Sequence, residues 1–480
     1  MEGPKGIQLE ATVGTTDRGS LWRATHESKH DRIVRIVEPR FCDGRFRQAL
    51  TNLRQRQHSR MLEITGEGWS GGHFYIEYVV ASPWRTLEER LAELASWRDR
   101  MVLLNQVCEV LARWQSSPVH PLGLNLRNIV VMRDAGRWYP WLAPCPAITV
   151  SSPCDLFGFD STVVAALAPE VIRGAQLDER AQDAYALGTL VAQAIGCPES
   201  RLAAADDENR IEAQARGALL LSVAEGSRIP SFLHSTPQVQ QLFQTIKHYR
   251  HTKPDARPHG ATELSSAVNA VADPIALAGT LRSADPDRAL EVLSWAGNGD
   301  EQLAVRAAVL AAEISTEAGD PQRALPYLDQ AVSLAPNRLD LRRQRSESRW
   351  RVFKALPQGE SSDREGELLL EDLALLTDPR LKHLDRNADS TLCLRAAEVH
   401  RRRGDPAAAA AKLFEAIKMD PSNLGALLSY MQCWIELGDR DNAEQTRTEA
   451  LRRIAKLEKS QMLTTREAQQ WREWFATFPY

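Results

Sequence analysis

The sequence predicts a chain of two parts, an α+β region followed by an all-α solenoid of helix pairs. Two observations carry this prediction. Up to about residue 272, segments that alternate polar and apolar residues, as strands do, come before segments that are mainly helical. From about residue 273 onward, strand patterns vanish, and a motif of Gly, Ala and Pro recurs at fixed spacing between helical segments.

Composition excludes several classes of partner. The 480 residues carry a formal net charge of -4, so no overall basic field indicates a nucleic-acid partner. No apolar run approaches the roughly 18 residues of a membrane helix, and the N-terminal MEGPKGIQLE lacks a signal-peptide core, so we expect no membrane partner. The seven cysteines are scattered without a Cys-x-x-Cys pair, which favours reduced thiols and a cytoplasmic location.

The first part divides into two lobes. Strand patterns appear in QLEATVGTT, SLWRAT, DRIVRIV and HFYIEYVV, and the helical pattern RFRQALTNLRQRQ precedes the last of them. From WRDRMVLLNQVCEVLARW onward the pattern is mainly helical, with strand-like pieces at NIVVM and RWYPWL. We therefore expect a strand-rich lobe over about residues 8–80 and a helix-rich lobe over about 81–272.

Repeats dominate the second part. In AGDPQRALPYLDQAVSLAP, Ala324, Ala331 and Pro336 follow Gly319 by 5, 12 and 17 residues. A later copy has Gly404, Ala409, Ala416 and Pro421 at the same offsets. The last copy has Gly438, Ala443 and Ala450, which follow Gly404, Ala409 and Ala416 by 34 residues each. Small Ala residues let two helices approach closely, Gly permits a left-handed turn, and Pro ends the second helix.

This spacing resembles that of tetratricopeptide (TPR) repeats. ADPDRALEVLSWA is an earlier copy, and a degenerate copy ends at Ala374 and Pro379. The resemblance implies roughly four to five repeats over residues 273–457 and a capping helix over residues 458–480. The alternative is an unrelated Ala-rich helical bundle.

A TPR array implies capture of a protein or peptide partner in the concave groove that the first helices form. The repeat register assigns the following residues to that groove: Arg306, Glu313, Glu317, Arg401, Arg402, Gln432 and Glu436. The alternative for each of these residues is an ordinary solvated helix face.

The first part contains a second set of motifs in a fixed order. They are VGTTDRGSLWRA with Gly14 and Gly19, RIVRIV with Arg35, PLGLNLRNIVV with Gly123 and Asn128, ALAPEVI with Glu170, RAQDAYALGTLVAQAIG with Asp183 and Gly188, and KPDARPHGATEL with Arg257. In this order they resemble the motifs of bacterial-type Ser/Thr protein kinases over about residues 8–272. The resemblance implies a bilobal kinase-like domain over residues 1–272, in which Glu170, Asp183, Gly188 and Arg257 hold the fold and Arg257 pairs with Glu170.

The positions that perform phosphoryl transfer in that family carry other residues here. Arg35 replaces the Lys of V-A-I-K, Ala49 replaces the Glu that pairs with that Lys, and Gly123 replaces the catalytic Asp. Asn128 is retained, whereas the WLAP segment at the metal-binding position contains no acid. The resemblance therefore implies a pseudokinase without catalytic residues or a metal ligand, and with weak or absent ATP and Mg²⁺ binding. Its degenerate nucleotide pocket would contain Gly14, Gly19, Arg35, Ile76, Gly123 and Asn128.

Two further readings remain open from the sequence. One is a kinase-fold enzyme for phospho- or nucleotidyl transfer with relocated acids, for which Asp155 and Asp160 are the nearest candidates. The other is a regulatory pseudokinase that binds nucleotide without turnover, although Ile33 at the position of a small Ala argues against it. The pair His248 and His251 lacks a third metal ligand, and Cys145 and Cys154 lack His partners at metal spacing, so we expect no metal site.

Overall fold

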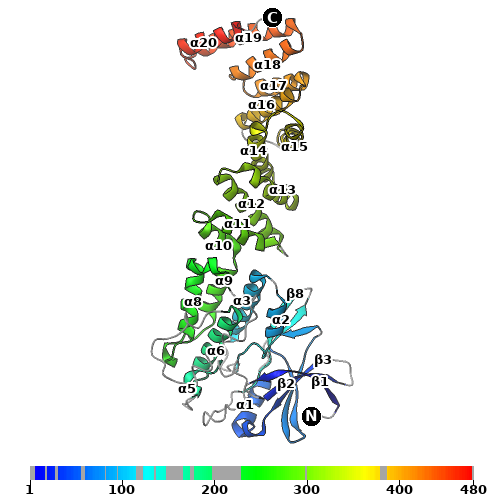
Figure 1. Ribbon diagram of the computed structural model, residues 1–480, viewed down its shortest axis with the longest axis vertical. Helices are drawn as coiled ribbons and strands as arrows, with labels where there is room; N and C mark the ends of the chain where they lie inside the picture. The colour runs from blue at the N-terminus through cyan, green and yellow to red at the C-terminus, as the bar shows by residue number, and fades with distance from the viewer. Residues whose placement is uncertain are drawn as a thin grey trace. The chain divides into compact units, whose positions relative to one another are not determined.

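The chain divides by its internal contacts into two compact units, Met1–Trp295 and Ala296–Tyr480. The computed structural model (Figure 1) describes residues 6–16, 19–26, 31–55, 60–81, 83–94, 96–114, 123–134, 137–146, 166–172, 178–196, 229–297, 300–378 and 386–477. The predicted order, an α+β region followed by an all-α region, is confirmed. Antiparallel sheets and helices make up the first unit, and helices alone make up the described part of the second.

The first unit begins with a five-stranded antiparallel sheet in the order β1-β2-β3-β5-β4. Its strands are β1 (Ile7–Thr16), β2 (Gly19–His26), β3 (Asp31–Val37), β4 (Ile64–Ser70) and β5 (His73–Val79). Helix α1 (Gly44–Gln55) follows β3 and buries Phe46, Leu50 and Leu53, which recur at helical spacing, in the core beneath the sheet. A smaller sheet contains β6 (Trp84–Thr86), β7 (Ile129–Asp134) and β8 (Arg137–Leu142).

Strand β4 was missed by the sequence patterns because glycines interrupt it. A Cβ atom at Gly66 would lie 2.6 Å from Glu77 Oε2, and one at Gly68 would lie 3.1 Å from the Tyr75 hydroxyl. Both neighbours belong to the paired strand β5, so the two glycines make room for its side chains. The glycines that weaken the strand signal are therefore favoured by the side chains of the paired strand.

The helical half of the first unit packs around α3 (Figure 1), which contacts α6, α9 and strand β8. Its helices are α2 (Leu87–Glu93), α3 (Trp97–Trp114), α5 (Pro169–Ile172), α6 (Glu179–Ala194), α8 (Pro237–Tyr249), α9 (Thr262–Ala272), α10 (Pro274–Leu281) and α11 (Pro286–Ser294). No single helix in the described ranges is long and apolar enough to cross a membrane. Helices α9 and α10 meet the length and composition criteria only together, and they are bent by 65°.

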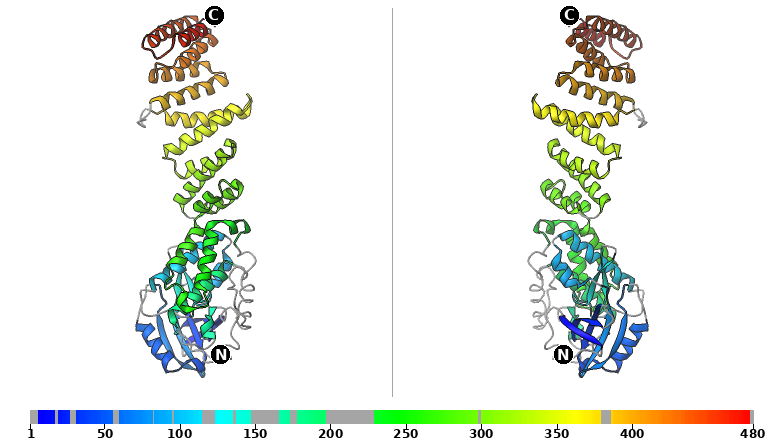
Figure 2. Two further views of the ribbon diagram at one scale, coloured as in Figure 1. Left: turned by 90° about the vertical axis from the view of Figure 1, so that its left-hand side faces the viewer. Right: turned by 90° about the vertical axis from the view of Figure 1, so that its right-hand side faces the viewer.

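The second unit is a stack of helices in which each contacts the next (Figure 2). They are α12 (Glu301–Glu317), α13 (Pro321–Leu334), α14 (Leu339–Ala355), α15 (Glu360–Leu376), α16 (Arg386–Arg402), α17 (Pro406–Met419), α18 (Leu424–Glu436), α19 (Arg440–Lys459) and α20 (Thr465–Ala476).

The repeat motif has the structural role that its residue types predict. Gly319, Gly404 and Gly438 adopt left-handed φ angles of 80°, 76° and 74° at the turns between paired helices. The Asp after each glycine caps the next helix by accepting a hydrogen bond from its backbone. The repeated alanines, which are Ala324, Ala331, Ala409, Ala416, Ala443 and Ala450, are all fully buried.

The degenerate copy departs from this pattern. Ala374, which the repeat motif places at a helix contact, is exposed on α15. The close approach occurs instead at Gly366, where a Cβ atom would meet Val399 Cγ1 at 3.0 Å and Phe353 Cε2 at 3.2 Å. A different face of α15 from the one that the motif predicts therefore packs on its neighbours.

Candidate functional site

Helices α16 and α18 bring together three of the residues that the sequence assigns to the groove. The Arg401 guanidinium donates to Gln432 Oε1 and to Glu436 Oε1, each at 3.3 Å. A second bridge joins the first helices of neighbouring pairs, from Arg395 on α16 to Glu347 on α14 at 2.6 Å. These charged groups therefore connect the first helices of neighbouring pairs.

The other groove candidates have different surroundings. Arg306, Glu313 and Glu317 are exposed along α12. Arg402 turns toward α14, where it donates to the Phe353 carbonyl at 3.2 Å and lies over the Phe353 ring. Arg402 thus contributes to packing between helices, which the sequence did not indicate.

His400 lies one turn before Gly404, the glycine of the turn between α16 and α17, and its surroundings disfavour the protonated imidazole. Burial lowers the pKa of its imidazole from the usual 6.5, with Asp405 opposing the shift and Arg403 and Lys412 adding to it. The folded state therefore binds this proton less tightly than the unfolded chain does. The stabilising contribution is present above about pH 6.5 and is lost as the pH falls toward the lowered pKa.

We expect the second unit to lose unfolding free energy through this residue as the pH falls below about 6.5, because the unfolded chain then binds the proton more readily than the folded one does. The His400→Gln variant should show a smaller loss over the same range, measured by hydrogen–deuterium exchange of α16 and α17. A matched His259→Gln variant, at an exposed position of the first unit, should leave the loss unchanged. Equal pH dependence in the parent and in His400→Gln would contradict the assignment.

In the first unit, a buried polar network connects the five-stranded sheet with the loop before β7. Arg35, fully buried on β3, donates from Nη2 to Asn128 Oδ1 at 2.9 Å. Asn128 Nδ2 in turn donates to the Gly123 carbonyl at 2.5 Å. Asn125 Oδ1 accepts from the Arg127 and Asn128 amides, each at 2.9 Å, and so holds the turn. The structure thus brings Arg35, Gly123 and Asn128 together.

The remaining residues assigned to a degenerate nucleotide pocket lie on the same sheet. Ile76 is fully buried on β5 and pairs directly with Arg35. Gly14 pairs with Leu21 across the β1–β2 hairpin. Gly19 has a φ of 127°, and a Cβ atom there would lie 1.8 Å from the Ile36 carbonyl oxygen. The close contact with β3 is therefore enough to explain why position 19 carries a glycine.

The structure also joins two residues that are distant in the sequence, Glu170 and Arg257. The Arg257 guanidinium donates two parallel bonds to the Glu170 carboxylate, at 2.6 and 2.8 Å. It also donates to the carbonyls of Ala181 and His251, at 3.0 and 2.7 Å. The Arg257 side chain is fully buried and that of Glu170 is 12% exposed, so this is an internal ion pair with most of its donors satisfied.

Helix α6 supplies the surroundings of this pair. Gln182 donates to the Ala166 carbonyl and accepts from the Ala168 amide, which holds the segment before Glu170. Asp183 is buried on the same helix. A Cβ atom at Gly188 would lie 2.7 Å from Tyr249 Cβ, so this glycine allows α6 and α8 to pack closely.

Several sequence predictions fall on residues outside the described ranges, among them Asp155, Asp160, Cys154 and Pro379. Ala49 is described and is half-buried on α1. The described residues contain no group of three or more His, Cys, Asp or Glu side chains arranged to hold a metal ion. The five described cysteines are buried free thiols.

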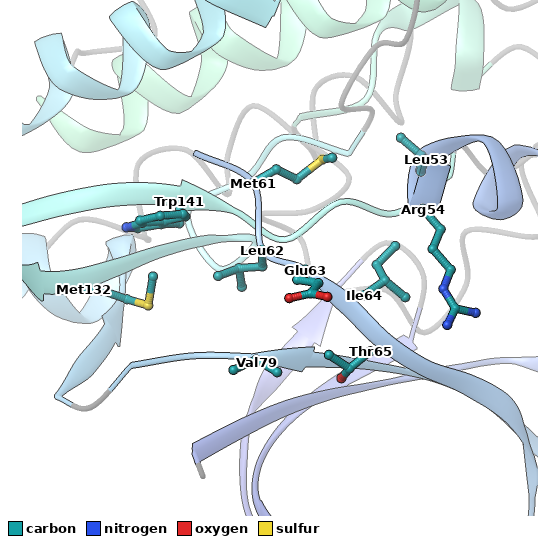
Figure 3. A pocket seen from close by; sticks show the side chains of 10 residues that line it. All are labelled: Leu53, Arg54, Met61, Leu62, Glu63, Ile64, Thr65, Val79, Met132 and Trp141. Carbon is teal, nitrogen blue, oxygen red and sulfur yellow. The ribbon is translucent and has the colours of Figure 1, made fainter. Parts of the chain in front are cut away.

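A cavity of about 560 Å³ lies in the first unit, and none of the residues of this polar network lines it (Figure 3). It is lined by Leu53, Arg54, Met61, Leu62, Glu63, Ile64, Thr65, Val79, Met132 and Trp141. These residues come from the end of α1, the segment leading into β4, the end of β5, and strands β7 and β8. No sequence pattern indicated the cavity, because its walls come from five separate segments.

Comparison with known proteins identifies one segment of the chain. The family model for the tetratricopeptide repeat matches residues 400–463, which include α17, α18 and α19. Helices in this segment have the capped, glycine-separated arrangement described above. No curated protein matches the sequence. A segment of tetratricopeptide-repeat type thus lies in the second unit, and arrays of such repeats present extended surfaces for protein partners.

Proposed function

We propose that the chain is a non-catalytic scaffold that binds a protein partner through its helical repeats. The observation that carries this proposal is the run of capped helix pairs from α16 to α19, part of which matches the tetratricopeptide-repeat model. Stacked repeats of this kind expose a continuous surface on their first helices. Arg306, Glu313, Glu317, Gln432 and Glu436 are the groove residues that we assign to partner contact.

For the first unit, we propose a pseudokinase-like domain without turnover. Three observations support this. The Glu170–Arg257 ion pair is the pair that the resemblance implies, Gly188 occupies a tight helix contact, and the described strands and helices follow the expected order. Phosphoryl transfer depends on positioned charges and metal ions. Gly123 carries no proton acceptor, and Asn128 is occupied with Arg35 and Gly123 rather than open to a metal ion.

Partner capture by the full chain tests the scaffold proposal. We expect a Glu313→Lys/Glu436→Lys double variant to lose at least one partner that the parent retains after crosslinking, because two exposed groove charges are reversed. The matched control is Glu371→Lys, an exposed position on the second helix α15, which should retain the same partner. A partner that is lost equally from both variants, or from neither, would contradict binding through the groove.

Calorimetric titration with ATP, with and without Mg²⁺, tests the non-catalytic part. We expect no saturable heat for the full chain, because the Arg35 side chain is buried against Asn128 in the place where the resemblance puts a phosphate-binding Lys. A saturable Mg²⁺-dependent heat would instead favour a nucleotide-binding regulatory domain.

A cytoplasmic location is part of the proposal and is supported by the free thiols.

A further inference from the structure

The cavity of the first unit has the volume of a small-molecule site. Its volume of about 560 Å³ falls in the range that ligand pockets occupy, roughly 300–1,000 Å³. Seven of its ten lining residues are apolar, although Leu62, Ile64 and Met132 are themselves buried in a core cluster and polar atoms form much of the exposed wall. Met61 and Met132 are flexible thioethers that can adapt to a ligand, and Trp141 offers an aromatic wall.

Two opposite charges complete the lining. Arg54 on α1 and Glu63 before β4 are both exposed, and neither has an ion-pair or side-chain hydrogen-bond partner among the described residues. In the view of Figure 3, Trp141 and Met132 lie on one side of Glu63, and Ile64 and Arg54 lie on the other. The aromatic and charged side chains therefore follow the order Trp141, Glu63, Arg54 in this view.

From this order we infer that the cavity binds an α-amino acid with a large apolar side chain. The apolar side chain would lie among Trp141, Met61 and Val79, the apolar lining residues that are partly exposed. The ammonium group would face the Glu63 carboxylate, and the ligand carboxylate would face the Arg54 guanidinium, a geometry that guanidinium groups favour. The adjacent ammonium and carboxylate of one molecule satisfy both free charges, which a simple amine or a simple acid cannot do.

The Trp141 ring is held in place by a cation on one of its faces. The Arg60 guanidinium lies 5.1 Å from the centre of the Trp141 ring and 4.5 Å from that of Tyr139. Backbone bonds between Leu62 and Leu142, at 2.8 Å, and between Leu142 and Arg60, at 3.0 Å, fix the segment that carries Met61 to strand β8. The aromatic wall and the Glu63 segment are therefore held relative to each other, which lowers the cost of ordering the site.

A set of three probes with one shared phenyl body tests the inference on the full chain. L-phenylalanine carries both charges, phenethylamine lacks the carboxylate, and phenylpropionate lacks the ammonium. We expect isothermal titration or ligand-observed NMR to show L-phenylalanine binding about three- to tenfold more tightly than either analogue, since each lost contact is a partly exposed charge pair.

Variants assign each charge to its residue. Glu63→Gln should lower the affinity for L-phenylalanine to about that for phenylpropionate, and Arg54→Gln should lower it to about that for phenethylamine. Thr65→Trp, which fills the cavity from an exposed position on its wall, should abolish binding of all three probes. The matched controls Arg45→Gln and Glu10→Gln, exposed positions outside the cavity, should bind L-phenylalanine as the parent does.

The inference is overturned by any of three results, provided that the variants melt at the temperature of the parent. The first is an absence of saturable L-phenylalanine binding, the second is equal affinity for all three probes, and the third is undiminished binding by Thr65→Trp. The repeat groove lies in the other unit, so none of these results bears on the scaffold proposal.

Discussion

Replacing Arg257 with methionine is expected to lower the unfolding free energy of the first unit by about 3–5 kcal/mol. The variant leaves the Glu170 carboxylate, only 12% exposed, without the two bonds that now balance its charge. It also removes the donors to the Ala181 and His251 carbonyls, which connect α6 with the segment before α9. The loss arises mainly from the uncompensated charge, since methionine retains much of the side-chain volume.

The measurement is hydrogen–deuterium exchange of the α6 and α9 amides across a denaturant series. A single melting curve would mix two units that need not unfold together. The Glu170→Met/Arg257→Met double variant should be less destabilised than the sum of the single variants, because no charge is left alone. Arg45→Met, on an exposed face of α1, should change exchange little. If the double variant loses as much unfolding free energy as the two single variants together, the interaction between Glu170 and Arg257 does not contribute to stability.

Replacing Asp372 with asparagine is expected to destabilise the second unit by a similar amount, about 3–5 kcal/mol. Asp372 on α15 is fully buried and accepts from Arg345 Nε and Nη2 at 2.8 and 2.5 Å. Arg349, 5% exposed, lies 3.8 Å away and bonds Asp329 and Glu365, both at 2.8 Å. Asparagine keeps the shape but removes the charge that faces these arginines.

The electrostatic environment of Arg345 agrees with this expectation. Burial lowers the pKa of its guanidinium, but hydrogen bonds and charge from Asp372 and Asp329 outweigh burial and raise the pKa overall. Exchange of the α14 and α15 amides measures the effect, and Asp363→Asn, exposed on the same helix, is the matched control. If Asp372→Asn lowers the unfolding free energy no more than Asp363→Asn does, the buried cluster has no stabilising role.

The repeats could be predicted because each motif residue acts locally. Gly438 is needed for one left-handed turn, Asp439 caps the helix that follows it, and Ala443 and Ala450 are small where two neighbouring helices touch. These roles depend on residues within about one helix pair, so fixed spacing in the sequence carries them. The same reasoning placed most strands of the first unit, where alternation of polar and apolar residues reflects one buried face.

Contacts between distant segments could not be predicted in this way. The sequence placed Arg35 and Asn128 in one expected pocket, yet their direct hydrogen bond depends on how the sheet meets the loop before β7. The exposure of Ala374 likewise depends on how α15 rotates against α14 and α16. The cavity draws its walls from segments up to 88 positions apart, from Leu53 to Trp141, and no local pattern encodes such a set.

By itself, the sequence determined the order of the two parts, the helix-pair repeats and most element types, because these follow from propensities, caps and periodicity within short stretches. Apart from the Glu170–Arg257 pair that the resemblance implied, tertiary structure decided which charges pair, which glycines a neighbouring strand requires, and where a cavity opens. Arg345 with Asp372, and Gly19 with Ile36, illustrate the difference. Burial and distance are properties of the packed chain, and they set both the strength of an ion pair and the room left for a ligand.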